Sequence, residues 1–367
     1  MKDHIRHLGV VFVIVLIYLT ILIGTIVEFD AAAFPKPTVR HMLNGVWAEE
    51  VEDYLQEHLG FHDTLFRIKS QTDLFIGEKM VQGVYITDDM LLEKLYAEDI
   101  PGTEVMAEEP NRFYRETGVP TFFLLVPSAS DIYEGRLPAN AVNADERELI
   151  RETYAATDTG VRCVDAYNIL SSLKTDYIYY RTDTHWTSFG AYSVYQNAIQ
   201  KMGFSAVPYQ RFVISHLSTE FRGDLYERTL YDGVRPDMLD LYTYERGSSV
   251  TSVVAYYADG SVIDRGTTLY QPSALQTEDM YRLYLGTPCV KLVIKTDVDS
   301  GQKLLLYKDD FADCMVPFLL QHYSEICVVD LEQTGAHYPE AADPSAYTQA
   351  LFLCSMKNWE HIWQQTS

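Results

Sequence analysis

The sequence is poor in positive charge. Its 29 lysines and arginines stand against 52 aspartates and glutamates, which gives a net charge of −23. Binding to a phosphate backbone needs clustered basic side chains, so this balance argues against nucleic acid as a partner. The five cysteines include no C-x-x-C pair, which argues against a structural zinc site and a disulfide framework. The 367 residues, which show no internal repeat, are enough for one large or two modest domains.

Long apolar runs are also scarce, since only one occurs. Residues 8–27, LGVVFVIVLIYLTILIGTIV, are 20 residues without a charge, about the length needed to cross a bilayer as a helix. Basic residues precede this run and acidic residues follow it. The pattern predicts a single-pass anchor in the cell membrane, with residues 1–7 in the cytoplasm and the rest outside. A cleaved signal peptide is the alternative, because Ala31-Ala32-Ala33 imitates a cleavage site.

The remainder divides into a membrane-proximal part and a main domain. Residues 28–100 are expected to form a Pro-punctuated linker, two helices and a β-hairpin over 83–94. From residue 101 to 367, helical patterns alternate with apolar strands, which predicts an α/β domain with a mostly parallel sheet covered by helices on both faces. The strands are expected at 121–127, 161–164, 176–180, 290–296, 304–307, 325–330 and 350–354, and a helix is expected around 314–322. Residues 205–290 break this rhythm and predict a β-rich insertion, with a hairpin turn at Asp259-Gly260.

The sharpest local signal is the heptapeptide RTDTHWT at 181–187, placed between a predicted strand and a helix over 188–202. Ligands of open α/β sheets bind beyond the carboxyl ends of strands. An Asp two residues before a His can orient the imidazole, which then acts as a general base toward a hydroxyl. The motif is short, and an exposed Asp beside a structural His gives the same letters. The spacing alone therefore leaves both interpretations open.

Several blocks of the chain resemble the DHHW protein family. DTHWTSFGAY at 183–192 is similar to the family's D-H-H-W block, and the blocks LLVPSASDIYEGRLP (124–138), FRGDLYERT (221–229) and GQKLLLYKDDFADC (301–314) agree in order. The family is related to alginate acetylation proteins of the SGNH-hydrolase type. The resemblance implies an SGNH-like extracytoplasmic domain with Ser-His-Asp chemistry, in which Asp183 orients His185 and His185 is the general base.

The resemblance also implies a partner and a substrate class. Such proteins transfer or hydrolyse acetyl groups on cell-surface or exported polysaccharides, beside a membrane-bound O-acyltransferase. It implies no cofactor and no metal. We assign Arg181, Trp186, Lys308 and Asp309, which flank the expected catalytic positions, to substrate binding.

The serine block departs from the family pattern. Where the family reads roughly K-D-S-Y-A-N-C/S, this chain reads KDDFADC at 308–314, so Asp310 occupies the nucleophile position. A carboxylate has no proton for His185 to remove. Asp183 and Asp310 would then flank His185, and an ion pair would replace the catalytic dyad. Family members also tend to carry Gly-Gly-Asn where this chain has Gly286-Thr287-Pro288, so the oxyanion donors are in doubt.

Other interpretations of KDDFADC remain open. Asp309 or Asp310 can cap a helix N-terminus. Asp183, His185, Asp309, Asp310 and Asp313 can converge on a metal, which would make the protein a metal-dependent hydrolase. An active acetyltransferase or acetylesterase could use Asp310 or another group as nucleophile; the remaining candidates are Cys314, Ser128 and Ser130. The leading expectation is a pseudoenzyme that binds a glycan or organises its partners.

Overall fold

The computed structural model describes residues 61–96, 100 and 102–358, with residues 12, 15–16, 18–27, 30, 33–37, 47, 51 and 54 nearer the N-terminus. The chain divides into two compact units. The smaller comprises residues 1–78 and 229–231, and the larger comprises 79–228 and 232–367. The hairpin that the sequence predicts at 83–94 therefore lies in the larger unit. The helix predicted before residue 60 lies largely outside the described residues.

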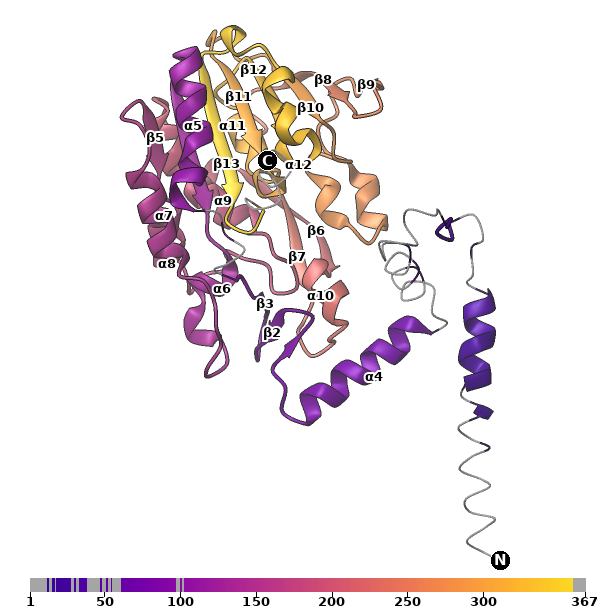
Figure 1. Ribbon diagram of the computed structural model, residues 1–367. Coiled ribbons are helices and arrows are strands. Elements are labelled where there is room, and N and C mark those ends of the chain that lie inside the picture. Colours follow the sequence, from indigo (N-terminus) through magenta and orange to yellow (C-terminus); the bar gives the residue numbers. More distant parts are fainter. Residues whose placement is uncertain are drawn as a thin grey trace, which may run out of the picture. The chain divides into compact units, whose positions relative to one another are not determined.

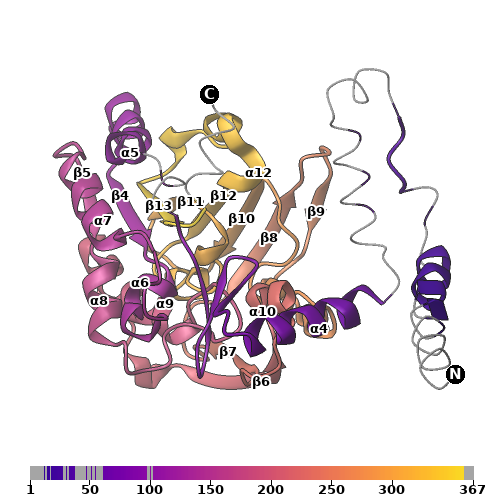
Figure 2. The ribbon, with the colours of Figure 1, turned by 60° about the horizontal axis from the view of Figure 1, so that its bottom comes forward.

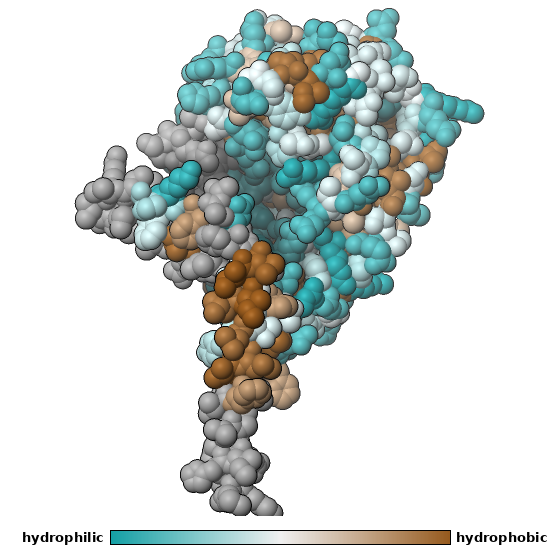
Figure 3. Space-filling model, turned by 90° about the vertical axis from the view of Figure 1, so that its right-hand side faces the viewer, coloured by the Kyte–Doolittle hydropathy of each residue, from teal (hydrophilic) through white to brown (hydrophobic). Residues whose placement is uncertain are grey.

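The smaller unit contains helix α4, His62–Phe75. The hydroxyl of Ser70 donates to the carbonyl of Thr229 at 3.0 Å, and the guanidinium of Arg67 donates to the carbonyl of Leu230 at 3.2 Å. Residues 18–27 are helical and expose apolar side chains, among them Leu22, Ile23 and Ile26. Figure 3 shows this segment as largely brown. Among the described residues, no helix combines the length and the apolar character needed to cross a membrane. The predicted segment 8–27 lies partly outside them.

An eight-stranded mixed sheet organises the larger unit, in the order β5-β4-β13-β11-β12-β10-β8-β9 (Figure 1). The first five strands in that order pair in parallel, and the last three pair antiparallel. The predicted α/β class is confirmed. The sheet was expected to be mostly parallel, but the structure shows a mixed sheet. The strands are β4 Thr121–Val126, β5 Val161–Val164, β8 Val250–Tyr256, β9 Val262–Asp264, β10 Lys291–Thr296, β11 Lys303–Lys308, β12 Glu325–Asp330 and β13 Gln349–Ser355.

Helices cover both faces of this sheet, as Figures 1 and 2 show. Alternate residues of a strand point to opposite faces. Thus Phe122 and Leu124 of β4 pack with residues of α6, α8, α9 and α11, whereas Phe123 and Leu125 pack with residues of α5, α7 and α12. The helices are α5 Thr103–Thr117, α6 Ala129–Ile132, α7 Glu146–Ala155, α8 Ala166–Ser172, α9 Ser188–Lys201, α10 Asp224–Thr229, α11 Val316–Leu319 and α12 Leu331–Thr334.

Smaller sheets complete the unit. The predicted hairpin is confirmed as β2 Val84–Ile86 and β3 Leu91–Glu93, with β1 Met80–Val81 added at its edge. Strands β6 Val213–Phe221 and β7 Asp237–Thr243 form a two-stranded ribbon. The predicted insertion at 205–290 is therefore only partly a separate lobe. Its second hairpin, turning at Asp259-Gly260, extends the main sheet as β8 and β9 because β8 pairs with β10.

Two predicted elements differ from the structure. Residues 176–180 do not form a strand of the sheet, and only Tyr179 bridges to Trp186. The reason is local: the backbone N–H of Tyr180 bonds the carbonyl of His185, so the segment folds onto its own loop. The helix expected near 314–322 is limited to a 3₁₀ turn, Asp310–Ala312, and the short α11, whose second residue is Pro317. Proline fits only the first turn of a helix because it lacks an N–H donor.

Candidate active site

The carboxyl ends of the parallel strands form one edge of the sheet, where three chain segments meet. Strand β11 ends at Lys308 and is followed by Asp309 and Asp310. Strand β12 ends at Asp330, and Lys357 follows shortly after the end of β13. In open α/β sheets this edge is where ligands bind.

A buried carboxylate fixes the RTDTHWT loop beside this edge. Asp237 of β7 is fully buried and accepts hydrogen bonds from the backbone N–H groups of Arg181 and Thr182, both at 2.8 Å. The hydroxyls of Thr182 and Tyr177 donate to the same carboxylate, each at 2.5 Å. A buried charge is tolerated only when donors satisfy it. Asp237 therefore holds the backbone of the loop in one conformation.

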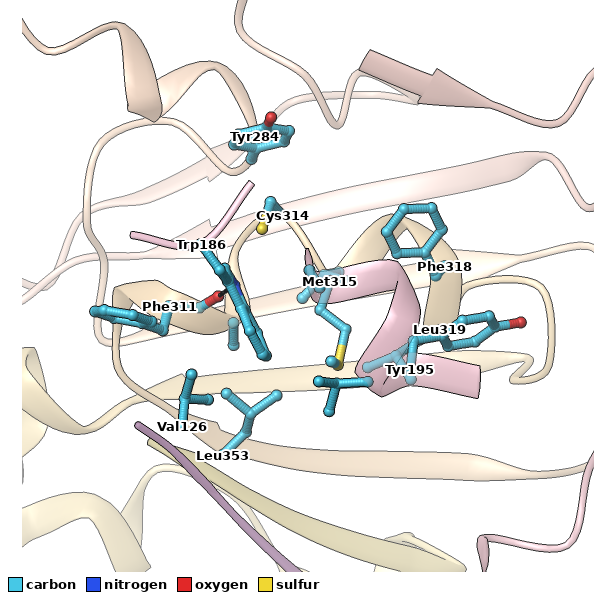
Figure 4. Packing of buried hydrophobic residues seen from close by; sticks show 14 of the residues in the cluster. Val126, Trp186, Tyr195, Tyr284, Phe311, Cys314, Met315, Phe318, Leu319 and Leu353 are labelled. Atoms are coloured by element: carbon cyan, nitrogen blue, oxygen red, sulfur yellow. Dashed lines mark hydrogen bonds between the residues drawn. The ribbon is translucent and has the colours of Figure 1, made fainter. Parts of the chain in front are cut away.

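Trp186 attaches the loop to the end of β11. Its indole N–H donates to the carbonyl of Phe311 at 2.7 Å, and its ring is fully buried in the core with Val126 and Leu353 nearby (Figure 4). This bond joins the two segments that carry the predicted catalytic positions. Trp186 thus has a structural role and presents no surface to a ligand.

Asp183 and His185 form an oriented pair. One oxygen of Asp183, Oδ1, accepts from the backbone N–H of His185 at 2.8 Å and lies 2.6 Å from its Nδ1. The imidazole stacks on the ring of Tyr281, with centroids 3.9 Å apart and planes inclined by 16°. The carboxylate fixes one ring nitrogen, and Nε2 consequently points away from it toward the end of β11.

Asp310 lies at that second nitrogen. Its Oδ1 is 3.2 Å from Nε2 of His185, an ion-pair distance without the alignment of a hydrogen bond. The side-chain amide of Asn358 donates to the same oxygen at 3.1 Å. The side chain of Asp310 is 43% exposed, whereas that of His185 is 10% exposed. His185 is therefore enclosed between two carboxylates, and only Asp310 is open to solvent.

Asp183, His185 and Asp310 lie in a line, and the charges of the two carboxylates favour a cationic imidazole between them. Burial lowers the pKa of His185, but the charges of Asp310 and Asp183 outweigh it and hold this pKa well above its usual range. Burial raises the pKa of Asp310, but the His185 charge, with Lys308 and Lys357, brings it well below its usual range. The pair is an ion pair at neutral pH, so His185 has no free lone pair with which to accept a proton.

The close approach of Gly223 shapes the other side of Asp183. A Cβ atom at residue 223 would lie 1.9 Å from Oδ2 of Asp183. The next residue, Asp224, donates its backbone N–H to the same oxygen at 3.4 Å, and its own carboxylate accepts from the N–H of Thr184 at 2.9 Å. The FRGDLYERT block thus packs its backbone directly against the orienting carboxylate, which only glycine permits.

A buried ion triad lies next to the His185 line. The ammonium of Lys308 is 2.8 Å from Asp313 and 2.7 Å from Asp330, and all three side chains are almost fully buried. Burial raises the pKa of Asp313 to about 6, although Lys308 opposes the shift. Lys308 is therefore committed to two carboxylates.

Asp309 is a structural residue. It is fully buried and accepts hydrogen bonds from the N–H and hydroxyl of Ser355 at 2.7 and 2.6 Å. It also accepts from the N–H of Phe311 at 3.2 Å, so the helix-capping interpretation is confirmed for Asp309. Burial raises its pKa to about 7.

A pocket of about 280 Å³ opens over these groups. Of the predicted site residues, Asp183, His185, Asp310 and Lys308 line it. Trp186 and Asp309 are fully buried behind it, and Arg181 stacks over Tyr177 instead. Three of the four residues assigned to substrate binding therefore lie outside the pocket wall, because each makes hydrogen bonds or ring contacts within the fold.

The alternative nucleophiles and the metal interpretation gain no support. Cys314 points into the core beside Trp186 (Figure 4), and burial raises its pKa to about 12. Ser128 donates to Glu146 and does not line the pocket. Within the described part of the chain, no group of three or more His, Cys, Asp or Glu side chains has metal-binding geometry. The five predicted ligands do not converge, since Asp309 and Asp313 face Ser355 and Lys308.

Two residues of the loop at 286–288 offer the pocket no free backbone N–H for an oxyanion. Gly286 and Pro288 both line the pocket. The N–H of Gly286 already bonds the carbonyl of Arg282 at 2.8 Å, and Pro288 has none.

Several residues of the pocket were not identified from the sequence. Tyr281, Asp224, Glu227 and Lys357 line it, and Asn358 contacts Asp310. The FRGDLYERT block was a signal for Asp224 and Glu227, since it is one of the blocks shared with the family. Tyr281 and Lys357 lie in segments without a recognisable pattern, and only the fold brings them to His185.

The fold and site define an α/β protein with a mixed sheet and an Asp-His-Asp line at the carboxyl edge of its parallel strands. A sequence model described as DHHW protein matches residues 75–329. The chain belongs to the DHHW protein family. No curated protein matches it.

Solved structures confirm the fold. A DHHW family protein from Eubacterium siraeum matches with a TM-score of 0.65 at 22% identity, over 76% of this chain and 93% of that one. Bacillus cereus PatB1, in a structure with a sulfonyl adduct, matches with a TM-score of 0.61 at 18% identity, over 75% and 95% of the two chains. Another structure of PatB1 gives a TM-score of 0.60 at 21% identity, over 75% and 96%.

Proposed function

We propose that this protein is a catalytically silent, SGNH-like member of the DHHW family that binds a cell-surface or exported polysaccharide during its O-acetylation. The observation that carries the proposal is the line of Asp183, His185 and Asp310 at the pocket. It has the geometry of a triad whose nucleophile position holds a carboxylate, with Oδ1 of Asp310 3.2 Å from Nε2 of His185. An ion pair of carboxylate and imidazolium contains neither a hydroxyl nucleophile nor a free base to deprotonate one.

We further propose the setting in which it acts. The segment 8–27 anchors the chain in the cell membrane as a single pass, with the larger unit outside the cytoplasm. A membrane-bound O-acyltransferase is the proposed partner that supplies acetyl groups. The apolar composition of residues 8–27 supports the anchor, and the resemblance to the acetylation relatives supports the partner.

Acetyl-ester hydrolysis by the purified full-length protein tests the proposal. We expect no turnover by the native chain and measurable turnover by Asp310→Ser, lost again when His185→Ala is added. His216→Ala is the matched control, because His216 pairs with Asp240 at 2.6 Å on an exposed surface away from the pocket. It should leave the Asp310→Ser activity unchanged.

Covalent labelling gives a second measurement. PatB1 has been solved with a sulfonyl adduct. We expect Asp310→Ser to form an adduct with a sulfonyl fluoride, detected as a mass increase, and the native chain to form none. Failure of Asp310→Ser to gain either reactivity would remove the support for Asp310 as the nucleophile position.

A second candidate is an active acyltransferase or esterase with Asp310 as a carboxylate nucleophile. The exposure of this side chain, 43%, favours it, because a nucleophile must reach the substrate. Native turnover that His185→Ala or Asp310→Asn abolishes would establish this candidate and refute the pseudoenzyme.

A further inference from the structure

A second pocket adjoins the first. It has a volume of about 620 Å³, and four residues line both pockets: Glu278, Asp279, Arg282 and Gly286. Volumes of roughly 300–1,000 Å³ are typical of small-molecule sites. Because these four residues line both pockets, the pockets lie side by side, one at His185 and the other at the β8–β9 hairpin, and the two together are referred to as the groove. Two adjacent pockets can hold neighbouring units of one oligomeric ligand.

The first pocket carries an excess of negative charge. Nine acidic residues line it, against three Lys or Arg residues and His185: Asp183, Asp224, Glu227, Glu278, Asp279, Asp310, Asp313, Asp330 and Glu332. Burial raises the pKa of Glu227, and the neighbouring Glu278, Asp224 and Asp279 add to the shift. The pocket therefore repels anions and attracts a cation.

The basic side chains of the pocket are already paired. Lys357 lies 3.1 Å from Glu93 and 3.5 Å from Asp224, and Arg282 bonds Asp279. Lys308 belongs to the buried triad. Among the described residues, no basic side chain pairs with Glu227 or Glu278, and both are exposed. These two carboxylates are available to a ligand.

His185 offers a second point of contact. The residue is 8% exposed, it lines the first pocket, and its Nε2 has no hydrogen-bond acceptor among the described residues beyond the misaligned ion pair with Asp310. A buried donor without an acceptor is unfavourable. A hydroxyl oxygen of a ligand in the pocket would satisfy it.

The second pocket is built differently. Its wall combines an aromatic ring, Tyr257, and an apolar side chain, Ile263, with the polar side chains of Gln271, Ser273 and Thr277. Arg265 holds the Tyr257 hydroxyl at 2.8 Å and bonds the carbonyl of Leu285, so the ring is fixed in place. The side of the larger unit that carries β8 and β9 is mostly hydrophilic (Figure 3). Fixed aromatic rings beside amide and hydroxyl groups suit the mixed polar and apolar faces of a sugar.

We propose that this groove binds an oligosaccharide with free amino groups, its ammonium groups against Glu227 and Glu278 and its further sugars in the pocket of Tyr257 and Ile263. The inference rests on the proposed function, since it names the glycan class for the same site. It selects against polyuronates and phosphate-linked glycans, whose negative charges are repelled by the excess of acidic over basic residues in the first pocket. The contacts to Glu227 and Glu278 are solvent-exposed, so salt weakens them.

Calorimetric titration of the full-length protein with defined hexasaccharides tests whether positive charge on the ligand strengthens binding. We expect the glucosamine hexamer to bind at least about tenfold more tightly than the N-acetylglucosamine hexamer, and a uronic acid hexamer not to bind. Raising the salt concentration from about 50 to 500 mM should remove most of the preference. The glucosamine dimer should bind more weakly than the hexamer, because it occupies one pocket only.

Variants locate the two pockets. Glu227→Gln with Glu278→Gln should weaken the glucosamine hexamer roughly fivefold or more. The matched control is Glu152→Gln on α7, which is also exposed but lines neither pocket and should change nothing. Tyr257→Ala should weaken the hexamer and leave the dimer unchanged.

The outcomes separate this inference from the proposed function. Equal binding of glucosamine and N-acetylglucosamine hexamers overturns the proposed preference for amino sugars, but it leaves intact the proposal of a catalytically silent protein that binds a glycan. Binding of oligolysine with no binding of any hexamer overturns both. Acetyl-ester turnover by the native chain overturns the proposed silence but not the preference for amino sugars.

Discussion

The Nε2 atom of His185 and the Oδ1 atom of Asp310 lie 3.2 Å apart, across the gap between the RTDTHWT loop and the end of β11. Asp183 holds the opposite side of the ring. The three residues therefore form a line of carboxylate, imidazolium and carboxylate. The predictions below follow from this line and from the buried charges around it.

Removing the charge of Asp310 should release the proton of His185. In Asp310→Asn, we expect the pKa of His185 to fall back toward its usual range, because the larger of its two favourable charges is gone. A pH titration of the imidazole NMR signals measures the change. Asp240→Asn, beside the exposed His216, is the control and should not move the His185 signals. An unchanged His185 pKa in Asp310→Asn would contradict the ion pair.

The same pair should contribute stability within a defined pH window. The pKa of His185 is raised, so its contribution is complete below about pH 6.5 and is lost as the pH rises through the raised value. The pKa of Asp310 is lowered, so its contribution is present above about pH 4 and is lost as the pH falls further. The difference in unfolding free energy between native and Asp310→Asn should be largest between about pH 4 and 6.5. Urea unfolding at several pH values checks this.

Gly223→Ala should disturb Asp183. The added methyl group would lie 1.9 Å from Oδ2, so the backbone or the carboxylate must move. We expect a loss of about 1–3 kcal/mol in the free energy of unfolding and a shift of the His185 NMR signals. Gly135→Ala is the control, since nothing lies within 4 Å of the added atom there. Equal stability of the two variants would show that Asp183 is not held against this backbone.

Lys308→Met should be among the most destabilising single changes in the larger unit. It leaves the buried carboxylates of Asp313 and Asp330 without their shared cation. Breaking a buried ion pair in this way costs about 3–5 kcal/mol. Lys303→Met on the same strand removes a partly exposed lysine 3.6 Å from Glu325 and should cost about 1 kcal/mol or less. Denaturant unfolding of both variants compares them, and similar losses would argue against the triad.

Glu146 should make the protein less stable as the pH rises. It is fully buried, and burial raises its pKa to about 8, from a usual value near 4.5. Between these values the unfolded chain loses its proton and the folded chain keeps it, so folding is increasingly disfavoured from about pH 4.5 to 8. Glu146→Gln removes this term, and we expect a flatter dependence of Tm on pH. The exposed Glu152→Gln on the same helix is the control, and a slope as steep in Glu146→Gln as in native protein would refute the assignment.

Much of the fold could be predicted because its signals are local. The apolar runs of β4, β11, β12 and β13 are buried on both faces, as parallel strands of α/β sheets are. Helix α9 begins and ends where its capping residues indicate: Thr187 accepts from the N–H of Gly190 at 3.2 Å, and Gly203 has a positive φ of 93°. Where a predicted element was wrong, a hydrogen bond within the local loop or a proline had displaced it, as at Tyr180 and Pro317.

The sequence by itself determined that Asp183 stands two residues before His185, a separation at which a carboxylate can reach an imidazole. It also determined that KDDFADC follows a buried strand. Only the tertiary structure decided the rest. Strand β13 enters the sheet between β4 and β11, and this placement brings Lys357 and Asn358 to the site. Tyr281 under the imidazole and Asp237 beneath the loop come from distant segments. Contacts between such segments depend on how the whole chain packs, so the sequence alone did not predict them.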